Sequence, residues 1–248
     1  MQKFKADLHI HTVLSPCADL EMSPKNIVRK AFEKGLNIIG ITDHNSTLQC
    51  KTVKKIASEY GIMVLTGAEV TSREDVHNLV FFENDEKLAE FQEFIERKQK
   101  KIKNDPLKFG FQAVVNENDV ILQEIDNYLG MALDAGIDEI EEKVHNLNGL
   151  YIPAHIDRVR YSLISQLGFV PDDIKADALE IYNRTSLSNF LAENNYLSGF
   201  TFIRDSDSHY IDNVGQFYNI FHLEEPTFKE VRMALKNKNK RRVEIDEL

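Results

Sequence analysis

The chain has few cysteines and no long apolar run. Only Cys17 and Cys50 are present among 248 residues, and their spacing does not suggest a disulfide framework. A reduced, intracellular compartment is the simpler interpretation of that scarcity. The N-terminus opens without the apolar region of a signal peptide, and no stretch is long enough to cross a membrane. We therefore expect a cytoplasmic protein with no membrane partner.

Several catalytic motifs are also absent. The sequence contains no G-x-x-x-x-G-K-[ST] phosphate loop, no G-x-S-x-G nucleophile elbow and no C-x-x-C zinc pair. With no activated serine or cysteine in view, water activated by a metal ion is the nucleophile to expect. No internal repeat or low-complexity linker divides the chain, so a single domain over residues 1–248 is expected.

The balance of charge is acidic. The 40 Asp and Glu residues outnumber the 30 Lys and Arg residues, which gives a formal net charge of -10. A negative surface disfavours electrostatic capture of long nucleic acid. Small phosphorylated substrates remain compatible, because bound metal ions would reverse the sign of the field inside a site. We therefore expect no long duplex nucleic acid among the partners, and the sequence leaves the oligomeric state open.

Six of the eight histidines lie in short clusters that contain a carboxylate or lie near one. Imidazoles suit zinc, iron and similar metals, while carboxylates can bridge two ions and offset their charge. The clustered residues are Asp7-Leu8-His9-Ile10-His11, Asp43-His44, Glu69, His77, Pro153-Ala154-His155 and Ser206-Asp207-Ser208-His209. This combination predicts a multinuclear metallohydrolase. His145 and His222 lack such a cluster and are expected to be structural.

Short apolar runs alternate with amphipathic helical segments along the chain. This alternation implies an α/β fold with parallel strands joined by helices, and a βα barrel fits the length. A hairpin inserted in the series is predicted over residues 112–124. The predicted strands are 4–9, 37–42, 62–70, 77–83, 149–154, 178–182, 200–203 and 216–222, and the main predicted helices are 24–33, 44–60, 86–103 and 137–147.

Motif residues recur at or just after the C-terminal ends of the predicted strands. In a βα barrel the active site is assembled at that rim, because the βα loops converge there. Glu69 and His155 could therefore meet despite their wide separation in sequence. Alternate residues of a strand face the same side, so Asp7, His9 and His11 are expected to point into the barrel mouth, with Asp7 orienting a metal-bound ring.

The ordered set of motifs resembles the polymerase and histidinol phosphatase (PHP) family of metal-dependent phosphoesterases. The resemblance extends from Asp7-Leu8-His9-Ile10-His11-Thr12 to Ser206-Asp207-Ser208-His209, which is nearly the whole chain. It implies a distorted (β/α)7 TIM-like barrel, with a helical and hairpin elaboration over residues 84–147. It also implies two to three divalent metal ions as cofactors, and zinc, manganese and iron all suit such ligands.

The same resemblance assigns ligands to three ions. One carboxylate would bridge the first two ions, and the third ion would lie beside them. The implied ligands are His9, His11, Glu69 and Asp207 for the first ion, Glu69, His77 and His155 for the second, and Asp19, His44 and His209 for the third.

Two points in this assignment have alternatives. The loop after the first motif is long, so either Asp19 or Cys17 is a candidate for the third ion, and the hard oxygen of Asp19 favours Asp19. Asp207 or His209 is the candidate for proton transfer during catalysis. Asp43, like Asp7, is expected to orient the metal-binding side chains without binding an ion itself.

Substrate phosphate needs fixed positive charge beyond the metals. Arg158, Arg160 and Arg184 lie near the motifs, and a guanidinium group can hold phosphate oxygens in a bidentate way. A salt bridge to a local aspartate is an equally open interpretation of each arginine. The expected activity is hydrolysis of a phosphate ester, with a small phosphomonoester, a nucleotide phosphodiester or a short oligonucleotide as substrate.

Two other function classes stay open. A non-phosphoester, amidohydrolase-like metallohydrolase would use similar ligands, although no lysine that could be carbamylated lies near the motifs. A catalytically silent, metal-stabilised regulatory module would not need to keep a complete ligand set, and this chain has one.

Overall fold

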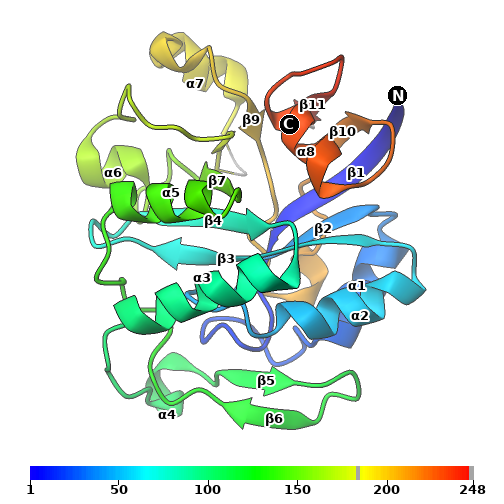
Figure 1. Cartoon of the computed structure of the whole chain (residues 1–248), viewed down its shortest axis with the longest axis vertical. Coiled ribbons are helices and arrows are strands. Elements are labelled where there is room, and N and C mark those ends of the chain that lie inside the picture. The colour runs from blue at the N-terminus through cyan, green and yellow to red at the C-terminus, as the bar shows by residue number, and fades with distance from the viewer. Residues whose placement is uncertain (183–184, 246–248) are drawn as a thin grey trace.

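The computed structural model describes residues 1–182 and 185–245 as a mixed α/β fold (Figure 1). Its strands are β1 (Gln2–Ile10), β2 (Ile38–Ile41), β3 (Met63–Thr71), β4 (His77–Phe82), β5 (Ala113–Val115), β6 (Ile121–Glu124), β7 (Leu150–Pro153), β8 (Leu179–Glu180), β9 (Phe202–Ile203), β10 (Asn219–Leu223) and β11 (Arg242–Ile245). Its helices are α1 (Pro24–Glu33), α2 (Cys50–Glu59), α3 (Asp85–Lys98), α4 (Pro106–Phe109), α5 (Ile137–Asn146), α6 (Leu163–Leu167), α7 (Leu187–Glu193) and α8 (Phe228–Leu235), with short 3-10 helices at Asn195–Leu197 and Ile211–Asn213.

Local sequence signals explain where the first helix begins and ends. The side chain of Ser23 accepts a hydrogen bond from the backbone N–H of Asn26, and Pro24 occupies the first turn, where its missing N–H removes no helical bond. Gly35 follows the helix with φ +68, a backbone conformation that suits glycine. The predicted helix over residues 24–33 is confirmed.

A curled sheet of seven strands forms the centre of the fold, in the order β11-β10-β1-β2-β3-β4-β7. Strands β1, β2 and β3 are parallel neighbours. Strand β4 runs antiparallel to β3 and β7 antiparallel to β4, while β10 runs antiparallel to β1 and β11 antiparallel to β10. The sheet is therefore mixed, with its parallel part in the middle.

The prediction that helices join parallel strands throughout is wrong for the outer strands. Only residues 72–76 lie between β3 and β4, whereas a parallel connection needs a crossover of about a dozen residues or more. Strand β11 lies beyond the last predicted strand, 216–222, and was not predicted. Helix α3 ends at Lys98 instead of Lys103, because Gln99 adopts an extended backbone with ψ 131.

Backbone hydrogen bonds continue the curl beyond the last strand of the sheet. The N–H of Ile156, just after β7, donates to the carbonyl oxygen of Glu180 in β8 at 2.9 Å. Strands β8 and β9 pair in parallel. After β9, the N–H of Ser208 donates to the His9 oxygen at 3.1 Å, and the N–H of His11 donates to the Ser208 oxygen at 3.0 Å. The loop after β9 is thereby brought back against β1.

The two faces of the sheet pack into separate apolar clusters. On β4, Leu79 and Phe81 belong to the cluster that α8 covers, and Val80 and Phe82 belong to the cluster that includes residues of α1, α2, α3 and α5. This period of two is the pattern of a strand buried on both faces. Full burial of each such side chain contributes about 1.5–3 kcal/mol, so the strand ends are firmly held.

The predicted hairpin is present as the antiparallel pair β5–β6, which lies beside α4 at one end of the molecule (Figure 1). Gln49 ties it to the main body, because its side chain donates to the Val115 oxygen at 2.8 Å and accepts from the Val115 N–H at 2.9 Å. Across residues 1–182 and 185–245, no helix combines the length and the apolar character that crossing a membrane requires.

Candidate metal centre

The histidines and carboxylates of the sequence clusters meet at one edge of the curled sheet. His77 reaches this edge because β4 runs antiparallel to β3. His77 at the start of β4 therefore pairs with Thr71 at the end of β3, whereas the start of a parallel strand would lie at the opposite edge. The assembled residues are His9 in β1, His11 just after it, His44 after β2, Glu69 in β3, His77 in β4, His155 after β7, and Asp207 and His209 after β9.

The first group contains His9, His11, Glu69 and Asp207. The Nε2 atoms of His9 and His11 are 3.2 Å apart. They lie 3.3 and 3.4 Å from the two oxygens of Glu69, and each lies 3.5 Å from Oδ1 of Asp207. Four side chains therefore bring potential ligand atoms to one place, and their assignment to a first ion stays a prediction.

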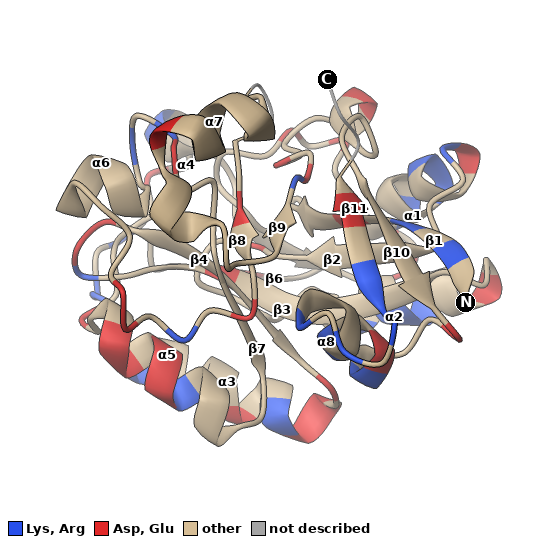
Figure 2. Ribbon diagram, turned by 90° about the horizontal axis from the view of Figure 1, so that it is seen from above, with Lys and Arg blue, Asp and Glu red and all other residues tan. Residues whose placement is uncertain are grey.

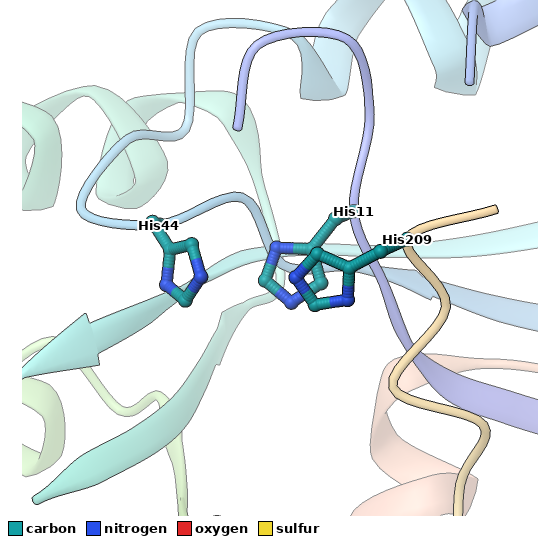
Figure 3. A group of neighbouring side chains, drawn as sticks. All are labelled: His11, His44 and His209. Carbon is teal, nitrogen blue, oxygen red and sulfur yellow. The ribbon is translucent and has the colours of Figure 1, made fainter. Parts of the chain in front are cut away.

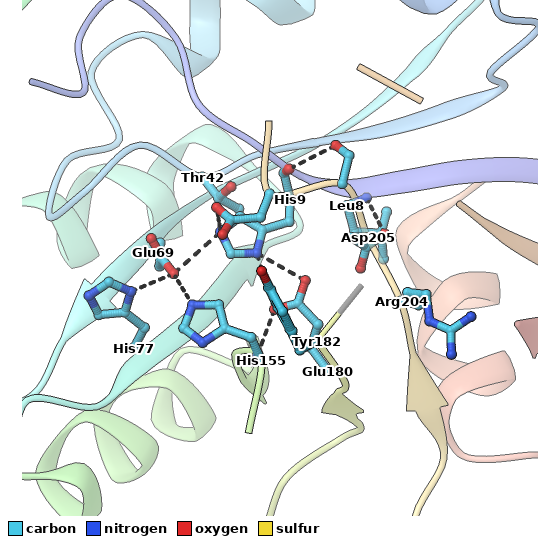
Figure 4. A network of polar contacts seen from close by, with 12 residues as sticks. Leu8, His9, Thr42, Glu69, His77, His155, Glu180, Tyr182, Arg204 and Asp205 are labelled. Atoms are coloured by element: carbon cyan, nitrogen blue, oxygen red, sulfur yellow. Dashed lines mark hydrogen bonds and ion pairs between the residues drawn. The ribbon is translucent and has the colours of Figure 1, made fainter. Parts of the chain in front are cut away.

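The second group is centred on the same carboxylate (Figure 4). Oε1 of Glu69 lies 2.8 Å from Nδ1 of His77 and 3.2 Å from Nε2 of His155. Glu69 is 1% exposed. A buried carboxylate that faces histidines on both sides is suited to bridging two cations.

The third group brings together His11, His44 and His209, whose ring nitrogens lie within 4.8 Å of one another. The ring centroids of His11 and His209 are 4.1 Å apart, and those of His11 and His44 are 4.6 Å apart. Figure 3 shows the three side chains approaching from separate segments of the chain. Imidazoles crowd in this way without repulsion when they are neutral or share a metal ion.

Buried polar atoms without a hydrogen bond show that this donor set fits metal ions. Nδ1 of His44, Oε2 of Glu69 and Nδ1 of His155 are buried, and none of them makes a hydrogen bond within the described part of the chain. Leaving such atoms unpaired costs about 1–3 kcal/mol each. The first two lie only 3.0 Å apart, and neighbouring cations of the centre would satisfy both.

The protonation of the centre without metal follows from burial and close charges. Burial disfavours the ionised Glu69, but His77 and His9 outweigh burial and hold the pKa of its carboxyl well below the ordinary value. Burial also opposes the charge on His9, yet Glu180 and Glu69 raise the pKa of that imidazole well above the ordinary value. For His77, burial dominates and lowers the pKa to about 4.

Glu180 contacts two residues of the centre, and the sequence interpretation missed it. Its carboxylate lies 2.9 Å from Nδ1 of His9 and accepts a hydrogen bond from the backbone N–H of His155 at 2.9 Å (Figure 4). It thus orients a ligand from β1 and one from β7. The available signal was a glutamate in the short strand predicted over residues 178–182, which is the same strand-end signal that identified Glu69.

Asp7 supports the centre from a different place than expected. Its carboxylate accepts hydrogen bonds from the Ser206 hydroxyl at 2.6 Å, the Ser206 N–H at 3.1 Å and the Gly215 N–H at 2.9 Å. The side chain against the His9 ring is Glu180. Asp7 therefore holds the loop that carries Asp207, and burial raises the pKa of its carboxyl to about 6.

Asp43 also supports the centre through an intermediate residue. It accepts hydrogen bonds from the Thr12 N–H at 2.7 Å and from the Ser15 hydroxyl at 2.7 Å. The Ser15 hydroxyl oxygen in turn accepts from the His44 N–H at 3.1 Å and lies 3.0 Å from Nδ1 of His11. Asp43 thus fixes Thr12 and Ser15 in the loop after β1, and Ser15 contacts both His11 and His44.

Two residues of the centre have an unusual backbone conformation. His155 has φ 29 and Asp207 has φ 49, in the left-handed region that residues other than glycine seldom adopt. Such a conformation costs on the order of 1–3 kcal/mol and persists only where surrounding contacts enforce it. The fold therefore holds these two side chains toward the cluster at some expense of stability.

The candidates for the third ion are placed differently. Asp19 is exposed, and its Oδ1 accepts a hydrogen bond from the Glu21 N–H at 2.8 Å. Cys17 lines the cavity beside His44 and His209. Burial would raise the pKa of the Cys17 thiol, but these two histidines outweigh it and lower the pKa to about 6. The assignment of Asp19 stays a prediction, and the geometry favours Cys17.

A cavity of about 250 Å³ opens onto the cluster. The residues that line it include Glu69, Asp207, Tyr128, Tyr161 and Arg158. A larger cavity of about 470 Å³ lies between α7 and β11 and contains none of the predicted ligands. The smaller cavity is therefore the one in which a substrate would meet the metal ions.

The arginines separate into different environments. Nη1 of Arg158 lies 3.0 Å from Oδ2 of Asp207 at the cavity, so this side chain reaches the centre. Arg160 is exposed and does not line the cavity. Arg184 lies outside the described residues. Arg204 is buried in the wall of the larger cavity, and its Nη2 donates to the Thr185 oxygen at 2.5 Å.

The two histidines expected to be structural lie away from the centre. His145 is on α5, with Nε2 3.9 Å from Oδ2 of Asp177. His222 is on β10, with Nε2 2.9 Å from Oε1 of Glu244. Neither belongs to a group of side chains that could hold a metal ion within the described part of the chain.

Two solved structures of endonuclease Q share this fold. The enzyme from Pyrococcus furiosus, a lesion-specific endonuclease, superposes with a TM-score of 0.76 at 22% identity, and the match covers 98% of this chain and 58% of that one. An endonuclease Q complex with a 27-mer duplex substrate that has an abasic lesion at the active site superposes with a TM-score of 0.75 at 22% identity, covering 97% of this chain and 58% of that one.

The expectation that excluded long duplex nucleic acid is wrong. It rested on the net charge of the chain, yet a protein with the same fold forms a complex with a 27-mer duplex substrate whose abasic lesion lies at the active site. Net charge is a property of the whole surface. Figure 2 shows acidic residues on outer helices such as α5, which contains Asp138, Glu139, Glu141 and Glu142. The field at a metal-lined cavity is set locally, so the total charge does not decide which polyanions fit there.

Sequence comparisons identify the family. The uncharacterized protein YqxK of Bacillus subtilis is 25% identical over 274 residues, a match that covers 98% of this chain and 64% of that protein. The chain thus spans less than two thirds of the length of each of these relatives. The PHP-associated family matches residues 192–239. The PHP domain matches residues 7–135, which is more than half of the chain. The matched segment contains His9, His11, His44, Glu69 and His77. The chain therefore belongs to the PHP domain family.

Proposed function

We propose that this chain hydrolyses phosphate esters with two to three divalent metal ions. The observation that carries the proposal is the presence of three overlapping groups of side chains that could hold metal ions, two of which share the buried carboxylate of Glu69. Family membership supports the metal centre, and the position of Arg158 at the cavity supports a phosphate-bearing substrate. We further propose a single domain over residues 1–248 and a cytoplasmic location.

The proposed ligand sets follow the three groups. Strands β8 and β9 pair with each other, and the loop after β9 brings Asp207 and His209 back to β1. This closure supports the interpretation of the sheet as a distorted (β/α)7 barrel. Zinc, manganese and iron suit the donor atoms. The proposed ligands are His9, His11, Glu69 and Asp207 for the first ion, Glu69, His77 and His155 for the second, and His44 and His209 with a residue of the preceding loop for the third.

The residues of the chain have separate tasks in the proposed reaction. Bound divalent ions would activate water and neutralise charge that develops on phosphate oxygens. Arg158 would hold a non-reacting oxygen of the phosphate, because its guanidinium group faces the cavity beside Asp207. Proton transfer is assigned to Asp207 or His209, whose side chains are 15% and 21% exposed and so can reach substrate.

Phosphate esters are a better match to this cavity than amides. No lysine is among the residues that line it within the described chain, so a carbamylated lysine bridge of the amidohydrolase kind has no candidate there. The complete set of ligands also argues against a silent module. Small phosphomonoesters, nucleotide phosphodiesters and oligonucleotides are the proposed substrate classes.

A substrate panel tests the proposal. Protein reconstituted with zinc, manganese or iron would be assayed on a phosphomonoester, a phosphodiester, single-stranded and duplex oligonucleotides, and an amide. We expect phosphoester hydrolysis that a chelator abolishes and metal restores. Amide hydrolysis in the absence of phosphoester hydrolysis would overturn the proposal in favour of the amidohydrolase-like alternative.

A further inference from the structure

We propose that the thiolate of Cys17, and not the carboxylate of Asp19, joins His44 and His209 as a ligand of the third metal ion. The inference rests on the metal centre proposed above and concerns which side chain of the long first loop reaches that ion. A soft sulfur ligand there would set this centre apart from one built of imidazoles and carboxylates alone.

The loop that carries Cys17 is anchored on both sides to the histidines of this group. Before it, the hydroxyl oxygen of Ser15 accepts from the His44 N–H at 3.1 Å and lies 3.0 Å from Nδ1 of His11. After it, the N–H of Asp19 donates to the His209 carbonyl oxygen at 2.8 Å. Each anchor is two residues from Cys17, so the thiol is held next to the rings.

The cavity brings these side chains together. Cys17, His44 and His209 all line it, and Asp19 does not. His44 is only 9% exposed, and its Nδ1 faces Oε2 of Glu69 at 3.0 Å without forming a hydrogen bond. A metal ion held between the ring and a nearby thiolate would give this buried imidazole a ligand contact.

The remaining candidates are occupied elsewhere. Oδ1 of Asp19 already accepts from the Glu21 N–H at 2.8 Å in an exposed turn, a contact that ligation by that oxygen would disturb. Cys50 is 1% exposed, and its sulfur lies 3.3 Å from the Gly67 oxygen in the core. Of the two cysteines, only Cys17 faces the cavity.

Cobalt substitution provides a direct test, because a thiolate bound to Co²⁺ produces a near-ultraviolet charge-transfer band that imidazole and carboxylate ligands do not. The metal-free full chain would be titrated with Co²⁺ alone. Wild type is expected to develop the band as the last equivalent binds. Cys17→Ser should lose the band and bind one ion fewer per chain, whereas Cys50→Ala and Asp19→Asn should keep both.

Metal preference gives a second measurement on the same proposal. A thiolate with two imidazoles favours zinc over manganese, and an oxygen ligand would reverse part of that preference. In competition experiments, Cys17→Asp should therefore take up more manganese relative to zinc than wild type does. Cys17 lies in an exposed loop, so these variants should fold.

The outcomes separate this proposal from the proposed function. If wild type binds two or three cobalt ions without the band, or if the band persists in Cys17→Ser, Cys17 is not a ligand, and the metal-dependent activity stands. If Asp19→Asn loses the third ion while Cys17→Ser keeps it, Asp19 is the ligand instead. If wild type binds no cobalt at all, both the ligand assignment and the proposed function are overturned.

Discussion

Glu69 connects the ligand groups at the residue scale. Its two oxygens face His9, His11, His44 and His77 at distances between 2.8 and 3.4 Å. No other described carboxylate is shared between two of the groups that could hold a metal ion. Loss of its charge should therefore weaken more than one ion at once.

Substitution Glu69→Gln tests this role. We expect kcat/KM for phosphoester hydrolysis to fall by about 100-fold or more, since even residues that only support ligands are typically worth 10–100-fold. Elemental analysis should show fewer ions per chain. The matched control is His145→Ala on α5, which should retain wild-type activity and metal content. Equal, small effects of the two substitutions would show that the site had been misplaced.

Arg158 is the residue that we propose recognises phosphate. Substitution Arg158→Ala should raise KM for phosphoesters about tenfold, which corresponds to the loss of one charge-assisted hydrogen bond. Metal content should stay constant, because bound ions can replace Arg158 as the counter-charge of Asp207. Arg160→Ala removes an exposed arginine two positions away and should change neither quantity. Identical kinetics of the two variants would rule out the assigned role.

At the element scale, the two-residue strand β8 links distant parts of the centre. Glu180 contacts the His9 ring of β1 and the His155 backbone after β7, so the strand aligns ligands that lie 146 positions apart in the sequence, from 9 to 155. Strand β8 is short, and its contacts with the His9 ring and the His155 backbone both come from the side chain of Glu180. A change there should affect metal affinity without removing a ligand.

Substitution Glu180→Gln should weaken metal binding by about 10–100-fold, the usual effect of removing a residue that orients a ligand. Calorimetric titration with metal would measure the change. Glu230→Gln is the control, because Glu230 is a buried carboxylate on α8 that pairs with Arg241 far from the centre. That variant should lower the melting temperature and leave metal affinity as in wild type. Unchanged affinity in Glu180→Gln would contradict the orienting role.

Elements with strong periodic signals could be predicted from the sequence. The Ser23-Pro24 start of α1 and the apolar run of β3 that carries Glu69 are local patterns, and both were located correctly. Strand direction was harder to predict. The antiparallel direction of β4 follows from the five-residue connection 72–76, and the sequence of that loop has no motif that indicates a direction. The partner of the His9 ring could not be chosen, since only tertiary contact distinguishes Glu180 from Asp7.

At the scale of the whole molecule, composition was a poor guide to partners. The charge of -10 is a sum over the chain, whereas the candidate metal centre lies at a cavity of about 250 Å³. The loop between β1 and α1, which contains Cys17 and Asp19, also could not be interpreted from the sequence alone. Spacing permitted either Asp19 or Cys17 as a ligand, and only the folded loop shows which of them lines the cavity.

Metal binding should be coupled to pH for the whole centre. In the metal-free protein, burial opposes protonation of His9, His44 and His209, yet Glu180 and Glu69 beside His9, Glu69 and Cys17 beside His44, and Cys17 and Asp207 beside His209 outweigh it and raise all three pKa values. A ligating imidazole must be neutral, so protons compete with ions. Affinity should therefore rise with pH through the neutral range, with protons released on binding. Titration calorimetry in buffers of different ionisation enthalpy would measure this release, and a pH-independent affinity would contradict it.

The central claim is that these ligands form a metal centre that hydrolyses phosphate esters. Its most direct test is stepwise reconstitution of the metal-free protein, with bound metal and phosphodiester hydrolysis measured in the same samples. Metal-free protein should be inactive, and activity should rise with occupancy until at least two ions are bound per chain. Less than one bound ion after full reconstitution, or hydrolysis that persists after the metal has been removed, would contradict the claim.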